Sequence, residues 1–167
     1  MLTINSQIKL AFTLGLICTL ACSKKEAADS TLENSISKSI LGTWTIRAAD
    51  VGTGVGNHSN EFAASAIGEK LEISVNDVHF RYFKFNDFDH APCTKLISTV
   101  TVVEGNSVWP FKRDTKSRFP KLGEAPQSLY QIEADCEIPM KEFLVTTDLK
   151  ELVFGWDAVA FRATKDK

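Results

Sequence analysis

The sequence lacks a strong excess of charge of either sign. It contains 19 basic and 21 acidic residues among 167. This near-neutral balance excludes the basic signature of nucleic-acid-binding proteins, so we expect no nucleic-acid partner. The chain also has no internal repeat and no low-complexity block. What remains is an ordinary globular composition, 44% hydrophobic, which is sufficient for a real core.

Motifs of common enzymes and metal sites are missing as well. There is no Gly-x-Ser-x-Gly, no His-Glu-x-x-His and no Cys-x-x-Cys. The histidines His58, His79 and His90 do not match a zinc spacing. Residues 87–90 place two carboxylates beside an imidazole, which makes a surface metal site conceivable, but a solvated loop is the better interpretation. We therefore expect a binding protein that is not an enzyme and has no cofactor and no bound metal.

Long hydrophobic runs are scarce, and the main one opens the chain. Residues 1–21 have the pattern of an export signal, with Lys9 ahead of an apolar run over residues 10–21 that is too short to span a bilayer. The run ends in Thr19-Leu20-Ala21-Cys22, which resembles the lipobox of bacterial lipoproteins. The resemblance implies cleavage before Cys22 and attachment of lipid, including palmitate, to that cysteine. The alternative is a plain secretory signal with an incidental cysteine.

The residues after Cys22 favour a tethered envelope protein. Residue 23 is Ser rather than Asp, which in enteric-type sorting directs a lipoprotein to the outer membrane, where it faces the periplasm. Residues 22–38 are polar, charged and free of aromatic side chains, so we expect a disordered tether there. The folded domain is then expected over residues 39–165, a length that suits one domain.

The folded part shows mostly the two-residue alternation of β-strands, with one helical stretch. The helix is expected from Ser59 or Asn60, which can cap it, to Gly68. The stretch 112–127 is basic and then punctuated by proline and glycine, which predicts a long exposed loop. Strands are expected at 40–48, 70–75, 78–85, 95–103, 129–134, 142–147, 151–154 and 158–163, with a weaker candidate at 107–111 that contains Pro110. Eight or nine short strands with tight connections favour a small antiparallel β-barrel, because closure removes exposed edges.

The two ends of this domain resemble the lipocalins and the wider calycin group. Gly42-Thr43-Trp44 looks like the Gly-x-Trp motif of the first strand, and Phe161-Arg162 lies in the final strand. The resemblance implies that Trp44 packs at the closed end of a barrel with Arg162 across its ring, so that Gly42, Trp44 and Arg162 form a structural floor; Arg47 competes for this role. Residues 64–80, Cys93, Cys136 and residues 153–162 are also similar to a group of uncharacterised bacterial lipoproteins with lipocalin-like domains.

Two cysteines remain once the leader is set aside. Cys18 leaves with the leader and Cys22 takes lipid, so Cys93 and Cys136 are the pair in the exported domain. An oxidising compartment predicts that they form a disulfide, and two buried free thiols are the alternative.

The aromatic residues suggest where a ligand would bind. Tyr82, Phe83 and Phe85 form one cluster, and Trp109 begins another that continues into basic residues. We expect these four residues to line an apolar pocket, although core packing explains alternate members equally well. The first functional hypothesis is a lipid-anchored envelope protein that holds a small apolar or amphipathic ligand in its barrel. The alternative is an inhibitor or immunity-type lipoprotein that binds a protein, like the lysozyme inhibitors.

Overall fold

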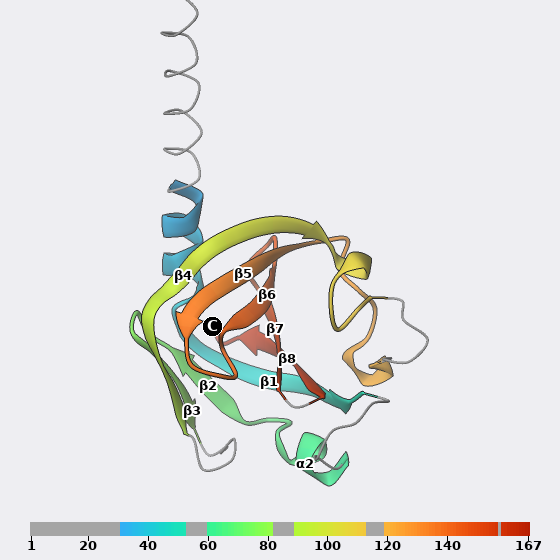
Figure 1. Cartoon of the computed structure of the whole chain (residues 1–167). Helices are drawn as coiled ribbons and strands as arrows, with labels where there is room; N and C mark the ends of the chain where they lie inside the picture. The colour runs from blue at the N-terminus through green and yellow to red at the C-terminus, as the bar shows by residue number, and fades with distance from the viewer. Residues whose placement is uncertain (1–30, 53–59, 82–88, 113–118, 157) are drawn as a thin grey trace, which may run out of the picture. The chain divides into compact units, whose positions relative to one another are not determined.

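The computed structural model describes residues 31–52, 60–81, 89–112, 119–156 and 158–167. Residues 36–167 form one compact unit, and we describe that unit by itself. Its eight strands pair in sequence order and close, with every pair antiparallel (Figure 1). This confirms the prediction of a mainly β fold built as a closed eight-stranded antiparallel barrel with one short helix. No helix of the described residues is long and apolar enough to cross a membrane.

The strands follow the expected alternation with modest changes at their ends. They are β1 (Gly42–Val51), β2 (Lys70–Ile73), β3 (Asp77–Arg81), β4 (His90–Glu104), β5 (Ser128–Cys136), β6 (Glu142–Thr146), β7 (Glu151–Trp156) and β8 (Val159–Lys165). The short helix α2 (Asn60–Ser65) occupies the expected place, and two 3-10 turns, η1 (Gly105–Ser107) and η2 (Pro120–Leu122), lie between β4 and β5. The barrel closes where β1 pairs with β8, with Trp44 opposite Lys165 and Val51 opposite Val159.

The folded chain begins earlier than expected. Residues 31–40 are helical, so this part of the predicted tether is ordered, and the predicted strand at 40–48 begins only at Gly42. Ile36 and Ile40 are at most 1% exposed and belong to the main core. The physical reason is that their spacing of four residues puts both on one face of a helix, where they pack against the barrel. Residues 22–30 lie outside the described residues.

The connection between β4 and β5 differs most from the expectation. Residues 107–111 do not form a strand; the chain turns through them, and the proline at 110 has no N–H to give to a ladder. The predicted loop at 112–127 is largely exposed in its described part, but two of its side chains are not: Phe119 is 7% exposed and Leu122 is 2% exposed. These side chains pack against Ala160, which faces outward from β8. This connection therefore covers the outer face of the barrel wall.

Candidate functional site

The connection between β4 and β5, residues 105–127, is held against the outside of the barrel at two polar points. We call it the strap, and it is described except for residues 113–118. The backbone N–H of Lys121 donates to Oδ2 of Asp50 on β1 at 2.9 Å, and Asp50 is only 3% exposed. The second point is Arg162 on β8, whose Nη1 donates to the carbonyl of Leu122 at 2.6 Å. Both strand residues face outward, so the strap fixes itself to β1 and β8.

Arg162 does not reach the Trp44 ring, and its predicted role in the barrel floor is wrong. Its Nη2 pairs with Oε2 of Glu151 on the neighbouring strand β7 at 2.5 Å. Along β8, Phe161 and Ala163 point into the core, so Arg162 between them points out. A residue at this phase of the strand reaches the strap rather than the interior.

The cation beside the Trp44 ring is Lys165. It stands opposite Trp44 in the β1–β8 register, so the two side chains share the inner face, and Nζ lies 5.8 Å from the centre of the indole ring. Lys165 Nζ also donates to the carbonyl of Ser39, while Trp44 Nε1 donates to the carbonyl of Ile40 at 2.8 Å. These carbonyls end the helix 31–40 and have no partner within it. Trp44 and Lys165 thus join the barrel end to that helix; Gly42 begins β1 with a φ of 115°.

The described interior of the barrel is filled by aromatic rings. Phe80, Phe154 and Phe161 are each at most 2% exposed. The ring of Phe154 lies 6.4 Å from that of Phe80 and 5.0 Å from that of Phe161, measured between centroids. Rings at these distances occupy the space that a ligand inside a lipocalin-like barrel would need. Hollows on the outer surface are therefore the candidate ligand sites.

The first hollow lies beside Trp109 of the strap and has a volume of about 370 Å³. Its apolar wall comes from Trp109 and from Leu144 and Val153, which face outward from β6 and β7. Trp109 is 44% exposed and meets Phe119 edge to face at 5.4 Å. Glu142 stands at the border of the hollow. The hollow can hold the apolar part of a small molecule and leave a polar part at its edge.

Gly155 on β7 makes the position of Trp109 possible. A Cβ added at this glycine would lie 1.8 Å from Cη2 of the indole, so no other residue allows the ring to lie on the strand at this point. Gly52 plays the same part for Phe119, whose ring would meet an added Cβ at 2.6 Å. Two glycines of the wall thus mark where the two aromatic side chains of the strap touch it.

A second hollow adjoins the first and shares Glu142 and Gly155 with it. Its volume is about 690 Å³. Half of its lining residues are charged, among them Lys95 of β4 and Asp135 of β5. Ile138 of the β5–β6 turn also lines it and is 64% exposed. Together the two hollows form a groove that is apolar at the Trp109 end and charged at the other. We call it the outer groove.

Of the four aromatic residues predicted to bind a ligand, only Trp109 is described. Tyr82, Phe83 and Phe85 lie outside the described residues, as does the lipidation candidate Cys22. Sequence reasoning missed Leu144, Val153 and Gly155. A signal for the first two exists: they are apolar at the outward phase of their strands, where alternation calls for polar residues.

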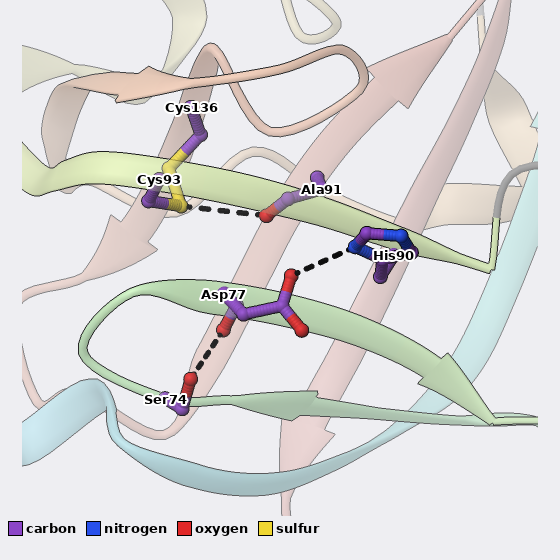
Figure 2. Close-up of a disulfide and its surroundings, with 6 residues drawn as sticks. All are labelled: Ser74, Asp77, His90, Ala91, Cys93 and Cys136. Carbon is purple, nitrogen blue, oxygen red and sulfur yellow. Dashed lines mark hydrogen bonds and ion pairs between the residues drawn. A yellow bond between two sulfur atoms is a disulfide. The ribbon is translucent and has the colours of Figure 1, made fainter.

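Cys93 and Cys136 are joined by a disulfide, as expected. They stand directly opposite each other on β4 and β5 (Figure 2). On the β3 side of β4, Nδ1 of His90 lies 3.4 Å from Oδ1 of Asp77, as Figure 2 also shows. Within the described ranges, no group of three or more His, Cys, Asp or Glu side chains is arranged to hold a metal ion.

The chain terminus carries one perturbed carboxyl group. The pKa of Asp166 lies below its ordinary value of 3.8, first because Lys70 Nζ donates to it at 2.8 Å and then because the Thr45 hydroxyl donates at 2.6 Å. Both bonds favour the charged carboxylate. They connect the end of the chain to β1 and β2, so this group supports the barrel and lies away from the outer groove.

Comparison of the chain with protein-family models, with curated proteins and with solved structures found no match.

Proposed function

We propose that this protein is a lipid-anchored protein of the bacterial cell envelope that binds a small amphipathic molecule in the outer groove. The single observation that carries the binding role is the half-exposed indole of Trp109 beside an apolar hollow of about 370 Å³. Exposed tryptophan in a concave apolar site favours ligand binding, because the ring offers a large rigid contact area. The interior is packed with aromatic rings, so the ligand binds outside the barrel rather than along its axis.

The two ends of the groove fit the two parts of an amphipathic molecule. At the apolar end, the surface that a ligand can reach is the half-exposed indole of Trp109, beside the buried side chains of Leu144 and Val153. Lys95 and Glu142 at the charged end can bind a polar group of either sign. A molecule of this kind removes apolar surface from water at one end and keeps its polar group hydrated at the other.

A fluorescence titration tests the binding role. Residues 23–167 contain the whole barrel unit. They are titrated with N-phenyl-1-naphthylamine, a neutral apolar dye. We expect saturable enhancement with the wild type and a loss of affinity of about tenfold with Trp109→Ser, because the indole wall is removed. Val102→Ser is the matched control, since Val102 is 62% exposed and does not line either hollow. Equal affinity of both variants would refute the proposal.

The anchor is tested separately. Cys22→Ser removes the only acceptor for lipid that the lipobox resemblance supplies. We expect the full-length wild type in the membrane fraction of a bacterial host and the variant in the soluble periplasmic fraction, because stable anchoring needs at least two acyl chains. Retention of Cys22→Ser in the membrane fraction would contradict lipid anchoring through this cysteine.

A protein partner is the second candidate function. The observation that favours it is Ile138, which stands 64% exposed on the β5–β6 turn at the edge of the charged hollow. An apolar side chain framed by charged groups has the arrangement of a small protein contact, with an apolar centre and a polar rim. Capture of a defined envelope protein by the wild type, lost with Ile138→Asp and kept with Trp109→Ser, would favour this candidate over the small-molecule role.

A further inference from the structure

Within the described part of the chain, the long strand β4 has no ladder partner along one edge over most of its length. On one side it pairs with β3 only through residues 90–92, and Cys93 adds one backbone bond to Asn76. On the other side it pairs with β5 as far as Glu104. Figure 1 shows β4 running well past the end of β3. Among the described residues, the backbone of 94–104 therefore has ladder partners on its β5 side alone.

The second half of this edge is regular. The register between β4 and β5 shifts between Cys93 and Thr99, and such bulges turn an edge away from a partner. From Thr99 to Glu104 the pairing with β5 is continuous, from Glu133 back to Ser128. Among the described residues, every second residue of this six-residue segment thus directs N–H and C=O groups without a ladder partner away from β5, in the regular geometry of a strand.

The composition of this segment provides little protection against pairing. Natural edge strands are commonly blocked by lysine, proline or a bulge. Residues 99–103 are Thr-Val-Thr-Val-Val, all β-branched residues that favour strands, and the single charge is Glu104 at the end. Thr101 is exposed, and Val102 is 62% exposed although it is apolar. An edge of this composition is therefore open to pairing with another strand.

The segment is complementary to itself. A two-fold axis at Thr101 would pair two antiparallel copies so that Thr101 meets its own equivalent and Val100 meets Val102 of the other copy. Pairs of β-branched residues in these positions stabilise a sheet. Glu104 would face Ser98, so no two like charges stand opposite each other. In every pair of this register both residue numbers are odd or both are even, so the two partners come from the same face of β4.

We propose that two copies of this protein associate through antiparallel pairing of their β4 edges, centred on Thr101. The arrangement is isologous, since each copy contributes the same surface. One added strand pair is a small interface, so the association is weak and depends on concentration. It is independent of ligand binding in the outer groove.

Sedimentation equilibrium of residues 23–167 up to millimolar concentration tests the proposal. The wild type is expected to pass from monomer to dimer as concentration rises. Thr101→Lys places two lysines opposite each other at the axis and is expected to weaken dimerisation about tenfold or more. Thr94→Lys is the matched control: this threonine is also exposed on β4 but has no counterpart in the paired segment, so its dimerisation should equal that of the wild type.

Charge complementation tests the register directly. Thr101→Lys and Thr101→Glu should each be monomeric at a concentration where the wild type dimerises, and an equimolar mixture should form the heterodimer, because lysine then faces glutamate at the axis. Circular dichroism confirms that each variant is folded. A wild type that stays monomeric throughout, or a Thr101→Lys variant that dimerises like the wild type, would overturn the proposal.

Discussion

The contact between Trp109 and Gly155 allows the position of the strap on the barrel wall to be tested by adding one methyl group at Gly155. In Gly155→Ala the added Cβ would lie 1.8 Å from Cη2 of the indole, 2.4 Å from Cζ3 and 2.8 Å from Cζ2. No real Cβ contact is so short, so the ring must leave its place on β7. The methyl group itself meets only this ring among its three nearest neighbours. The effect of the substitution should therefore depend entirely on Trp109.

The expected magnitude follows from the burial of the indole. Trp109 is 44% exposed, so just over half of its side chain contacts the rest of the protein. For a tryptophan this is on the order of 100 Å², worth about 2–3 kcal/mol of stability at ~25 cal/mol per Å². Alanine in a strand gains roughly 0.5–1 kcal/mol over glycine, which offsets part of the loss. We expect Gly155→Ala to lower the free energy of unfolding by about 1–2 kcal/mol.

The sign should reverse when Trp109 is absent. In a Trp109→Ala background the added methyl group has no ring to displace, so Gly155→Ala should raise the free energy of unfolding by a few tenths of a kcal/mol or more, from its strand preference alone. The coupling free energy of the double-mutant cycle is then about 2–3 kcal/mol. Urea unfolding followed by far-UV circular dichroism measures all four proteins.

Quenching of tryptophan fluorescence by acrylamide provides an independent readout. Of the three tryptophans, Trp109 is half-exposed while Trp44 is fully buried, so release of Trp109 in Gly155→Ala should increase the accessible fraction of the emission. A coupling free energy near zero, or an unchanged quenching curve, would refute the position we assign to the strap.

Three further predictions concern the rest of the barrel. Lys165→Met should lower the free energy of unfolding, measured in urea, by about 1–2 kcal/mol, because the carbonyl of Ser39 loses its donor and the indole of Trp44 loses its cation. A variant with unchanged stability would contradict the importance of these two contacts. Replacing Cys93 and Cys136 together by alanine should lower it by about 4 kcal/mol, given their separation of 43 residues, and a loss under 1 kcal/mol would show that the unfolded chain is little constrained by the bond. The pKa of Asp166 is lower in the folded than in the unfolded state, so its stabilising effect is present above the ordinary value of 3.8 and is lost as pH falls through the folded value. Asp166→Asn should therefore be less stable than the wild type at neutral pH and lose less stability below about pH 4 in thermal unfolding. Parallel curves of stability against pH for the two proteins would exclude this assignment.

The sequence by itself determined the kind of fold, because alternation is local information. Leu152 and Phe154 face the core and Glu151 faces outward because successive side chains of a strand alternate between its two faces. The same holds for the disulfide, since the expected leader would remove Cys18 and the expected lipid would occupy Cys22, which leaves one pair. Residues 31–40 show the limit of such reasoning: Ile36 and Ile40 have helical spacing, but the polar residues around them suggested a tether.

Only the tertiary structure decided what lies over the outside of the wall. Leu144 and Val153 point outward and are nevertheless buried, because residues far away in the sequence cross over them. The register of β1 and β8 decided in the same way that Lys165 rather than Arg162 meets Trp44. Local periodicity decides which side chains of a strand face inward. Closure of the barrel decides which residues stand opposite each other, and the path of the long connection decides which residues lie over a strand. Closure and connection path both depend on contacts between distant parts of the chain.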